Sequence, residues 1–109
     1  MPILITTTSD DKTKLQQIAQ RLVGERLAAC CQIIGPITSV YRWQDKIESA
    51  EEWMCIIKTD ESLYAAVEIA IRQQHHYAEP EIVAAQIVRG SAGYLQWLSD
   101  NVDLSGESS

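Results

Sequence analysis

The sequence predicts a single small α+β domain in which an antiparallel sheet is backed by two helices. The chain has 109 residues, which is the length of one ordinary domain. Runs of apolar and β-branched residues alternate with segments whose apolar residues recur at helical spacing. Their order is strand, helix, strand, strand, helix, strand, with an extra helix at the end, and this order predicts the fold class.

The first strand and the first helix have clear signals. Residues 2–8 are apolar or β-branched and predict a strand. Ser9, Asp10 and Asp11 then offer capping oxygens and negative charge for the start of a helix. The apolar face of this helix has five members: Leu15, Ile18, Ala19, Leu22 and Val23. Gly24 marks its end.

The second and third strands are expected to form a long hairpin. Residues 27–34 are almost continuously apolar, which is typical of a strand buried on both faces. Gly35 and Pro36 interrupt this run and predict a bend or bulge, because proline cannot donate to a ladder. Pairing is expected to resume through residues 37–43, and residues 46–59 form the return strand.

The length of this hairpin predicts self-association. Gln44 and Asp45 fit a two-residue turn, which places Trp43 opposite Lys46. Residues 27–43 fully extended would span about 55 Å, whereas a compact chain of this length is about 35 Å across. The hairpin should therefore project from the domain with open edges, and we expect it to dock on other copies in a homo-oligomer. The alternative is a hairpin that folds back sharply on a monomer.

The second half of the chain completes the pattern. A second helix is expected from Asp60 to about His75, because turn-forming residues and Pro80 follow. Residues 81–89 predict the last strand. A short final helix then carries Leu95, Leu98 and Val102.

These elements together give the split βαβ pattern of a ferredoxin-like sandwich. We expect one domain over residues 1–102 and a disordered polar tail over residues 103–109.

The composition excludes several partners. The formal net charge is −6, and no cluster of Lys and Arg offers the basic face that nucleic acids or anionic membranes require. No apolar run approaches twenty residues, and the N-terminus lacks the basic start of a signal peptide. We expect a cytoplasmic protein without nucleic-acid or membrane partners.

Three cysteines lie in apolar segments. Cys30 and Cys31 are adjacent on one strand and point to opposite faces, and Cys55 belongs to the return strand. An odd number of cysteines in such positions argues against a secreted disulfide framework. We interpret them as buried thiols that act as small hydrophobic residues.

The densest group of potential metal ligands surrounds Pro80. His75 and His76 precede it, and Glu79 and Glu81 flank it. Imidazoles with carboxylates suit copper(II), zinc or nickel. The alternative interpretation is a helix end where histidine favours the dipole, followed by a solvated acidic loop.

A second candidate site consists of aromatic residues and one lysine: Tyr41, Trp43, Lys58 and Tyr77. These side chains fit a small-molecule cleft where subunits meet. The alternative is interface packing, in which Tyr and Trp are also enriched.

Signals for catalysis are weak. The sequence has no Gly-x-Ser-x-Gly turn and no glycine-rich phosphate loop. Glu51 and Glu52 point to opposite faces of one strand and cannot form an acid–base pair. We expect the protein not to be an enzyme.

Six groups of residues, in order along almost the whole chain, resemble the CutA family. They are residues 25–30, 37–43, Glu52 with 57–59, His75-x-Tyr77, 80–82, and Tyr94-Leu95-x-Trp97-Leu98. The resemblance implies a tight homotrimer of ferredoxin-like subunits, similar in architecture to PII-like signalling proteins. It also implies a role in divalent-cation tolerance, and copper binding is attributed to the family.

The loop after the second helix departs from the family pattern. The family usually reads His-Pro-Tyr-Glu-x-Pro-Glu, whereas this chain has His76 at the first proline and Ala78 at the first glutamate.

The leading interpretation is therefore a divalent-cation binding protein, with copper as the expected ion and with His75, His76 and Glu81 as candidate ligands. The alternative is a PII-like module that binds a metabolite or partner at Tyr41, Trp43, Lys58 and Tyr77. A stable trimer without a ligand of its own also stays open.

Overall fold

The structure is a computed structural model and describes residues 1–104. The elements in chain order are β1 (Pro2–Ser9), α1 (Lys12–Gly24), β2 (Cys30–Trp43), β3 (Lys46–Asp60), a 3₁₀ turn (Glu61–Leu63), α2 (Tyr64–Gln74), β4 (Val83–Gln86) and α3 (Ala92–Asp100). All strand pairs are antiparallel, and the sheet order is β2-β3-β1-β4. The predicted ferredoxin-like α+β fold is therefore confirmed.

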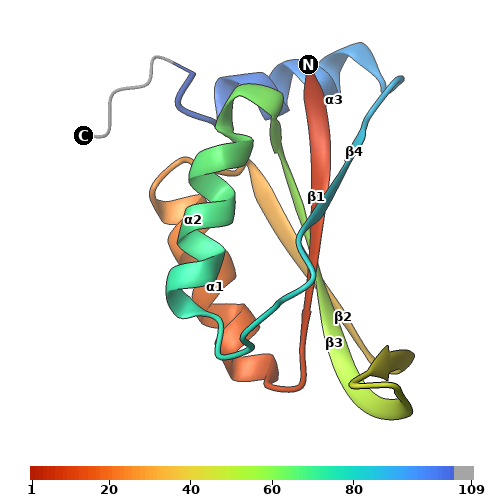
Figure 1. Ribbon diagram of the computed structural model, residues 1–109. Coiled ribbons are helices and arrows are strands. Elements are labelled where there is room, and N and C mark those ends of the chain that lie inside the picture. Colours follow the sequence, from red (N-terminus) through yellow and green to blue (C-terminus); the bar gives the residue numbers. More distant parts are fainter. Residues whose placement is uncertain (105–109) are drawn as a thin grey trace.

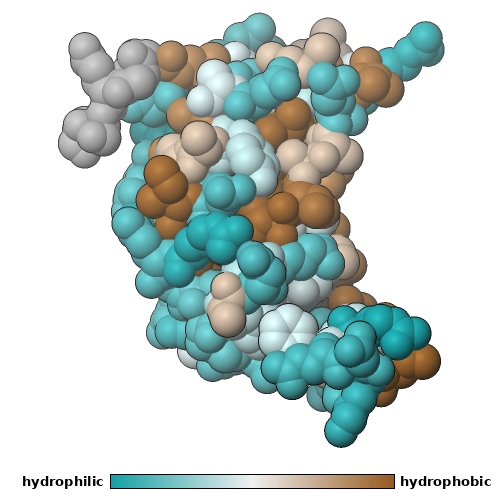
Figure 2. All heavy atoms as spheres, viewed as in Figure 1, coloured by the Kyte–Doolittle hydropathy of each residue, from teal (hydrophilic) through white to brown (hydrophobic). Residues whose placement is uncertain are grey.

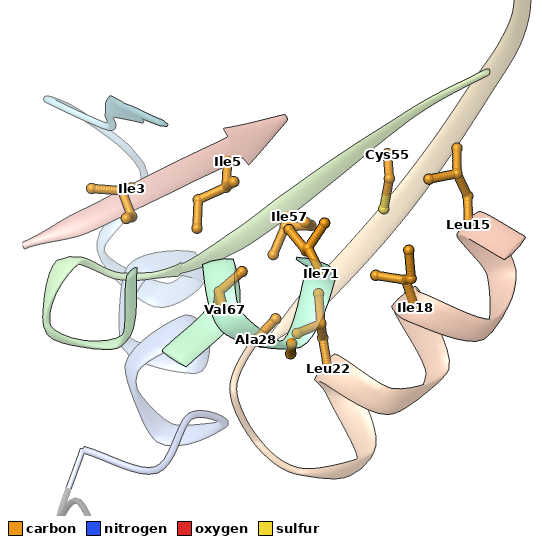
Figure 3. Close-up of a cluster of buried hydrophobic side chains, with 11 residues drawn as sticks. Ile3, Ile5, Leu15, Ile18, Leu22, Ala28, Cys55, Ile57, Val67 and Ile71 are labelled. Atoms are coloured by element: carbon orange, nitrogen blue, oxygen red, sulfur yellow. The ribbon is translucent and has the colours of Figure 1, made fainter. Parts of the chain in front are cut away.

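The two long helices cover one face of the sheet, and α3 lies across one end of it (Figure 1). The core fills the space between the sheet and these helices, and Figure 3 shows its side chains pointing toward one another. Its buried members are Ile3, Ile5, Leu15, Ile18, Leu22, Ala28, Cys55, Ile57, Val67, Ala70 and Ile71. The apolar positions predicted for the first helix supply three of them, because helical spacing places them on one face.

The first helix begins where its capping residues predict. Asp11 is the N-cap, and its side chain accepts a hydrogen bond from the Lys14 amide at 3.1 Å. Ser9 precedes it and accepts from the Asp11 amide at 3.0 Å. These bonds fix the junction between β1 and α1, which lies next to the candidate site described below.

The long hairpin has the predicted register. Trp43 pairs with Lys46, and both turn residues, Gln44 and Asp45, have positive φ angles of 49° and 65°. Such a turn matches the right-handed twist of the two strands. The ladder shifts register between Ile34 and Ile37, as Gly35-Pro36 predicts. The hairpin projects beyond the helices (Figure 1), and Figure 2 shows hydrophilic and hydrophobic residues side by side on it.

Two strand boundaries differ from the prediction. The second strand begins at Cys30 instead of residue 27, because the amides of Leu27 and Ala28 both donate to the Leu22 carbonyl at the end of α1. The last strand was predicted over residues 81–89 but pairs only from Val83 to Gln86. The Ile87 amide still donates to the Pro2 carbonyl at 3.0 Å, but Pro2 has no amide hydrogen to return a bond, so the ladder ends there.

The end of the domain is held against the segment that follows α1. The Asp103 amide donates to the Arg26 carbonyl at 2.9 Å. The rest of the predicted tail, residues 105–109, lies outside the described residues. Within residues 1–104, no helix is long and apolar enough to cross a membrane.

Candidate functional site

A cavity of about 740 Å³ lies between the end of β1, the projecting β2–β3 hairpin and the loop after α2. We call it the acidic cleft. Its walls are Thr8, Ser39, Val40, Tyr41, Trp43, Glu52, Tyr77, Ala78, Glu79, Pro80 and Glu81. Three of the four residues predicted for a small-molecule cleft, Tyr41, Trp43 and Tyr77, are therefore brought together. The same walls contain three carboxylates, those of Glu52, Glu79 and Glu81.

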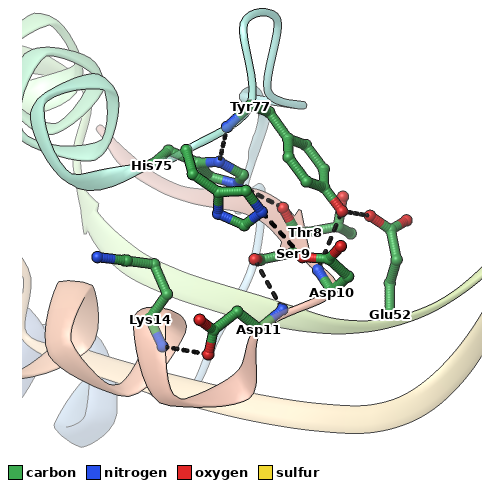
Figure 4. A network of polar contacts seen from close by, with 9 residues as sticks. Thr8, Ser9, Asp10, Asp11, Lys14, Glu52, His75 and Tyr77 are labelled. Atoms are coloured by element: carbon green, nitrogen blue, oxygen red, sulfur yellow. Dashed lines mark hydrogen bonds and ion pairs between the residues drawn. The ribbon is translucent and has the colours of Figure 1, made fainter.

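The phenol of Tyr77 is held by two polar groups at the end of β1 and on β3 (Figure 4). Its Oη donates to Glu52 Oε2 at 2.7 Å and accepts from the Asp10 amide at 3.0 Å. Burial raises the pKa of Tyr77, and the Glu52 carboxylate raises it further because it accepts the phenol proton. Tyr77 is therefore a fixed hydrogen-bond donor, and it supplies Glu52, only 5% exposed, with a hydrogen-bond partner for one carboxyl oxygen.

The imidazole of His75 is buried and uses both ring nitrogens. Its Nδ1 accepts from the Tyr77 amide at 3.1 Å, and its Nε2 lies 2.6 Å from the Thr8 carbonyl oxygen. An amide can only donate and a carbonyl can only accept, so the ring is the neutral tautomer that carries its proton on Nε2. This arrangement leaves His75 without a free lone pair for a metal ion.

His76 and Glu81 have separate partners. His76 Nε2 lies 2.9 Å from Asp10 Oδ1, and its side chain is 45% exposed. Its ring stacks on that of His75 with centroids 5.4 Å apart. Glu81 accepts from the Thr6 hydroxyl at 3.1 Å.

The predicted set of His75, His76 and Glu81 therefore does not fit a metal ion within one chain. Over residues 1–104, no three His, Cys, Asp or Glu side chains are placed to hold a metal ion together. Of this set, His76 has an oxygen ligand beside its ring nitrogen, because the carboxylate of Asp10, a residue outside the predicted set, lies 2.9 Å away. Whether these residues bind a cation stays a prediction.

Lys58 is the predicted cleft residue that the structure does not bring to the cleft. It lies six residues along β3 from Glu52, which is about 20 Å of extended strand. Its Nζ lies 5.4 Å from the centre of the Tyr94 ring, a cation–π contact with α3.

Sequence reasoning missed Thr8, Glu52 and Glu79 as cleft residues. A signal was available for Glu52, because the hairpin register places it on the same face of the sheet as Tyr41. No sequence signal was available for Thr8 and Glu79, because these two residues meet in the cleft only through the path that the loop after α2 takes back to β1.

Comparison with known proteins identifies the family. Residues 3–101 match the family model described as CutA1 divalent ion tolerance protein. The divalent-cation tolerance protein CutA of Thermus thermophilus is 38% identical over 99 residues, covering 91% of this chain and 94% of that protein. Human protein CutA is 38% identical over 91 residues, and the chain spans about half (51%) of its length.

Solved structures agree with the sequence comparison. The divalent cation tolerance protein from Thermus thermophilus has a TM-score of 0.92 at 35% identity and covers 94% of this chain and 100% of that one. CutA from Xylella fastidiosa has a TM-score of 0.90 at 36% identity, covering 94% and 98%. This chain therefore belongs to the CutA1 family of divalent ion tolerance proteins.

Proposed function

We propose that this chain binds divalent cations without catalysing a reaction, and that copper(II) is the preferred ion. The observation that carries the proposal is the concentration of acidic groups around one cleft. Glu52, Glu79 and Glu81 line it, and Asp10 lies beside it, with its amide bonded to the Tyr77 wall and its carboxylate next to His76, in a chain with a net charge of −6. The negative electrostatic potential of these groups raises the local concentration of cations.

The preference for copper(II) rests on His76. Carboxylates alone suit hard ions such as magnesium and calcium, whereas an imidazole nitrogen beside an oxygen ligand suits copper(II). His76 and Asp10 supply this combination at an exposed position. Two side chains are fewer than a closed site needs, so water or a second copy of the chain has to supply the other ligands.

The proposal includes a homotrimer in the cytoplasm. The hairpin carries exposed apolar side chains, among them Val40, Trp43 and Ile47, which favour docking on other copies. The cleft is built partly from this hairpin, so a neighbouring subunit would border it. The three free cysteines fit a reducing compartment such as the cytoplasm.

The chemistry of the cleft supports a binding role over catalysis. His75 has both ring nitrogens in hydrogen bonds, and Tyr77 holds its proton firmly. Neither group is therefore available as a general base or nucleophile.

Calorimetric titration with copper(II) at neutral pH tests the proposal. We expect His76→Asn and Asp10→Asn each to weaken binding about tenfold or more. Asp100→Asn is the matched control, because it removes one carboxylate charge at the end of α3, at the opposite end of the sheet from the hairpin (Figure 1). Equal losses in Asp100→Asn and Asp10→Asn would reduce the effect to net charge and contradict a site at His76.

A metabolite-binding module is the second candidate, and the volume of the cleft favours it. About 740 Å³ lies within the usual range for small-molecule sites, and Tyr41, Trp43 and Tyr77 offer aromatic faces. The acidic walls favour an amine-bearing ligand. A thermal-shift screen of amine metabolites should raise the melting temperature of the wild type but not of Trp43→Ala if this function is correct.

A further inference from the structure

Two cysteine thiols meet away from the acidic cleft, on the helix-facing side of the sheet. Cys31 on β2 pairs with Ile57, and Cys55 on β3 pairs with Ile33. Cys31 and Cys55 are therefore diagonal neighbours on adjacent strands, and side-chain alternation places them on one face. Cys55 is fully buried in the core (Figure 3), whereas Cys31 is partly exposed.

The two thiols influence each other's ionisation. The adjacent Cys55 side chain, together with burial, raises the pKa of the Cys31 thiol. The adjacent Cys31 side chain lowers the pKa of the Cys55 thiol, against the effect of burial. The strand register and these mutual effects place the two sulfur atoms near each other in largely apolar surroundings.

A groove gives access to the pair. Cys31 and Ile33 form one wall of a cavity of about 420 Å³ between β2 and α1. The facing wall consists of Gln16, Ala19, Gln20, Val23 and Gly24 of the helix. Cys31 lines this groove, so a small ion can approach it from solvent, and Cys55 is its diagonal neighbour in the buried core.

We propose that Cys31 and Cys55 form a two-sulfur site for a soft monovalent metal ion of the copper(I) class. Soft thiolate ligands select such ions over hard ones. Binding forms two metal–sulfur bonds and releases the two thiol protons to solvent, so that one ion and two thiols give one dithiolate complex and two protons. No oxidant or reductant takes part.

The number of ligands favours this class of ion. Zinc and copper(II) require about four ligands. In the part of the chain that the structure describes, no third His, Cys, Asp or Glu joins the two sulfurs to form a metal-binding group. Copper(I) accepts two sulfur ligands in a linear arrangement.

The spacing favours a metal bridge over a disulfide. Diagonal neighbours in an antiparallel ladder have Cα atoms about 7–8 Å apart, beyond the Cα separation of roughly 4.4–6.8 Å that a disulfide usually spans. A metal ion adds two bonds of about 2.3 Å between the sulfurs and so spans the larger distance without moving the strands.

This site is independent of the proposed function of the acidic cleft, because the two share no residue. Variants at His76 or Asp10 should leave binding at the two cysteines unchanged, and variants at Cys31 should leave copper(II) binding at the cleft unchanged.

The test is an anaerobic titration of the reduced full-length chain with copper(I) in competition with a colorimetric chelator. The wild type should bind one copper(I) per chain, with ultraviolet thiolate-to-copper absorption. Cys31→Ala and Cys55→Ala should each lose this binding. Cys30→Ala is the matched control, because Cys30 is the sequence neighbour of Cys31, points to the opposite face and contacts Tyr94 at 3.6 Å.

Circular dichroism checks that each variant folds. If Cys55→Ala does not fold, the partly exposed Cys31→Ala decides the result alone. Copper(I) binding that survives in Cys31→Ala, or that is lost in Cys30→Ala, would overturn the proposal. So would a mass spectrum in which the treated chain has lost two hydrogens to a Cys31–Cys55 disulfide and carries no copper.

Discussion

The Nδ1 atom of the buried His75 ring accepts a hydrogen bond from the backbone amide of Tyr77 at 3.1 Å. The opposite nitrogen of the ring bonds the Thr8 carbonyl on β1. The imidazole therefore ties the loop after α2 to the end of β1, and it positions the Tyr77 phenol against Glu52. A residue that sequence patterns suggest as a metal ligand acts in this chain as the support of the cleft wall.

Replacing His75 should destabilise the protein much more than replacing His76. His75→Ala leaves the Thr8 carbonyl and the Tyr77 amide without partners and should lower the free energy of unfolding by about 2–3 kcal/mol. His76→Ala removes an exposed hydrogen bond to Asp10 and should cost less than about 1 kcal/mol. Urea denaturation of both variants measures the difference, and equal losses would contradict the supporting role of His75.

Removing the Tyr77 hydroxyl should leave a buried carboxylate without its donor. Tyr77→Phe deprives Glu52 and the Asp10 amide of their shared partner, and we expect a loss of about 1–3 kcal/mol in unfolding free energy. Tyr64→Phe is the matched control, since the Tyr64 hydroxyl donates to the more exposed Glu68 at 2.9 Å. A larger loss in the control than in Tyr77→Phe would show that Glu52 does not depend on this bond.

The same phenol predicts a pH dependence on the alkaline side. The pKa of Tyr77 is raised in the folded state, first by burial and then by its hydrogen bond to Glu52. A raised pKa contributes stability that is fully present below the unfolded value of about 10 and is lost as pH rises toward the folded value. Unfolding free energy should therefore fall less steeply above about pH 10 in Tyr77→Phe than in the wild type. Identical slopes would refute this contribution.

Gly35 should resist substitution. Its φ is +151°, and a Cβ atom there would lie 2.5 Å from Cδ1 of the Trp53 ring. Gly35→Ala should destabilise the chain by about 2 kcal/mol or more, because both the backbone and the indole have to move. Gly93→Ala in α3 meets nothing within 4 Å and should raise stability by up to about 1 kcal/mol. Thermal melting of the two variants should therefore shift in opposite directions.

A charge placed at the tip of the hairpin tests the prediction that the hairpin docks on other copies of the chain. Ile47 is 72% exposed on the hairpin, and Ile69 is 57% exposed on α2. Ile47→Lys should dissociate the proposed trimer, whereas Ile69→Lys should leave it intact, because only the hairpin is expected to dock. Light scattering coupled to size-exclusion chromatography measures both masses. A wild type that elutes as a monomer would rule out the proposed assembly.

Local patterns predicted those parts of the structure that depend on neighbouring residues. The two-residue turn at Gln44 and Asp45 fixed the pairing of Trp43 with Lys46, and the alternation along the hairpin placed Tyr41 and Glu52 on one face. The capping oxygens before Lys12 gave the start of the first helix.

Long-range contacts explain what the sequence could not reveal. The bond between His75 and Thr8 joins residues 67 positions apart, and no local pattern indicates that both ring nitrogens are used. Lys58 was grouped with the cleft by its residue type, but the length of β3 places it near Tyr94 instead. The diagonal contact of Cys31 with Cys55 likewise required the register across the bulge at Gly35 to be known.

The most direct test of cation binding at the cleft is anomalous diffraction from crystals soaked in copper(II). We expect a copper peak within bonding distance of His76 and Asp10, with the His75 ring still bonded to Thr8 and Tyr77. A peak bonded to a His75 nitrogen, or copper bound only at sites remote from His76, would contradict this expectation.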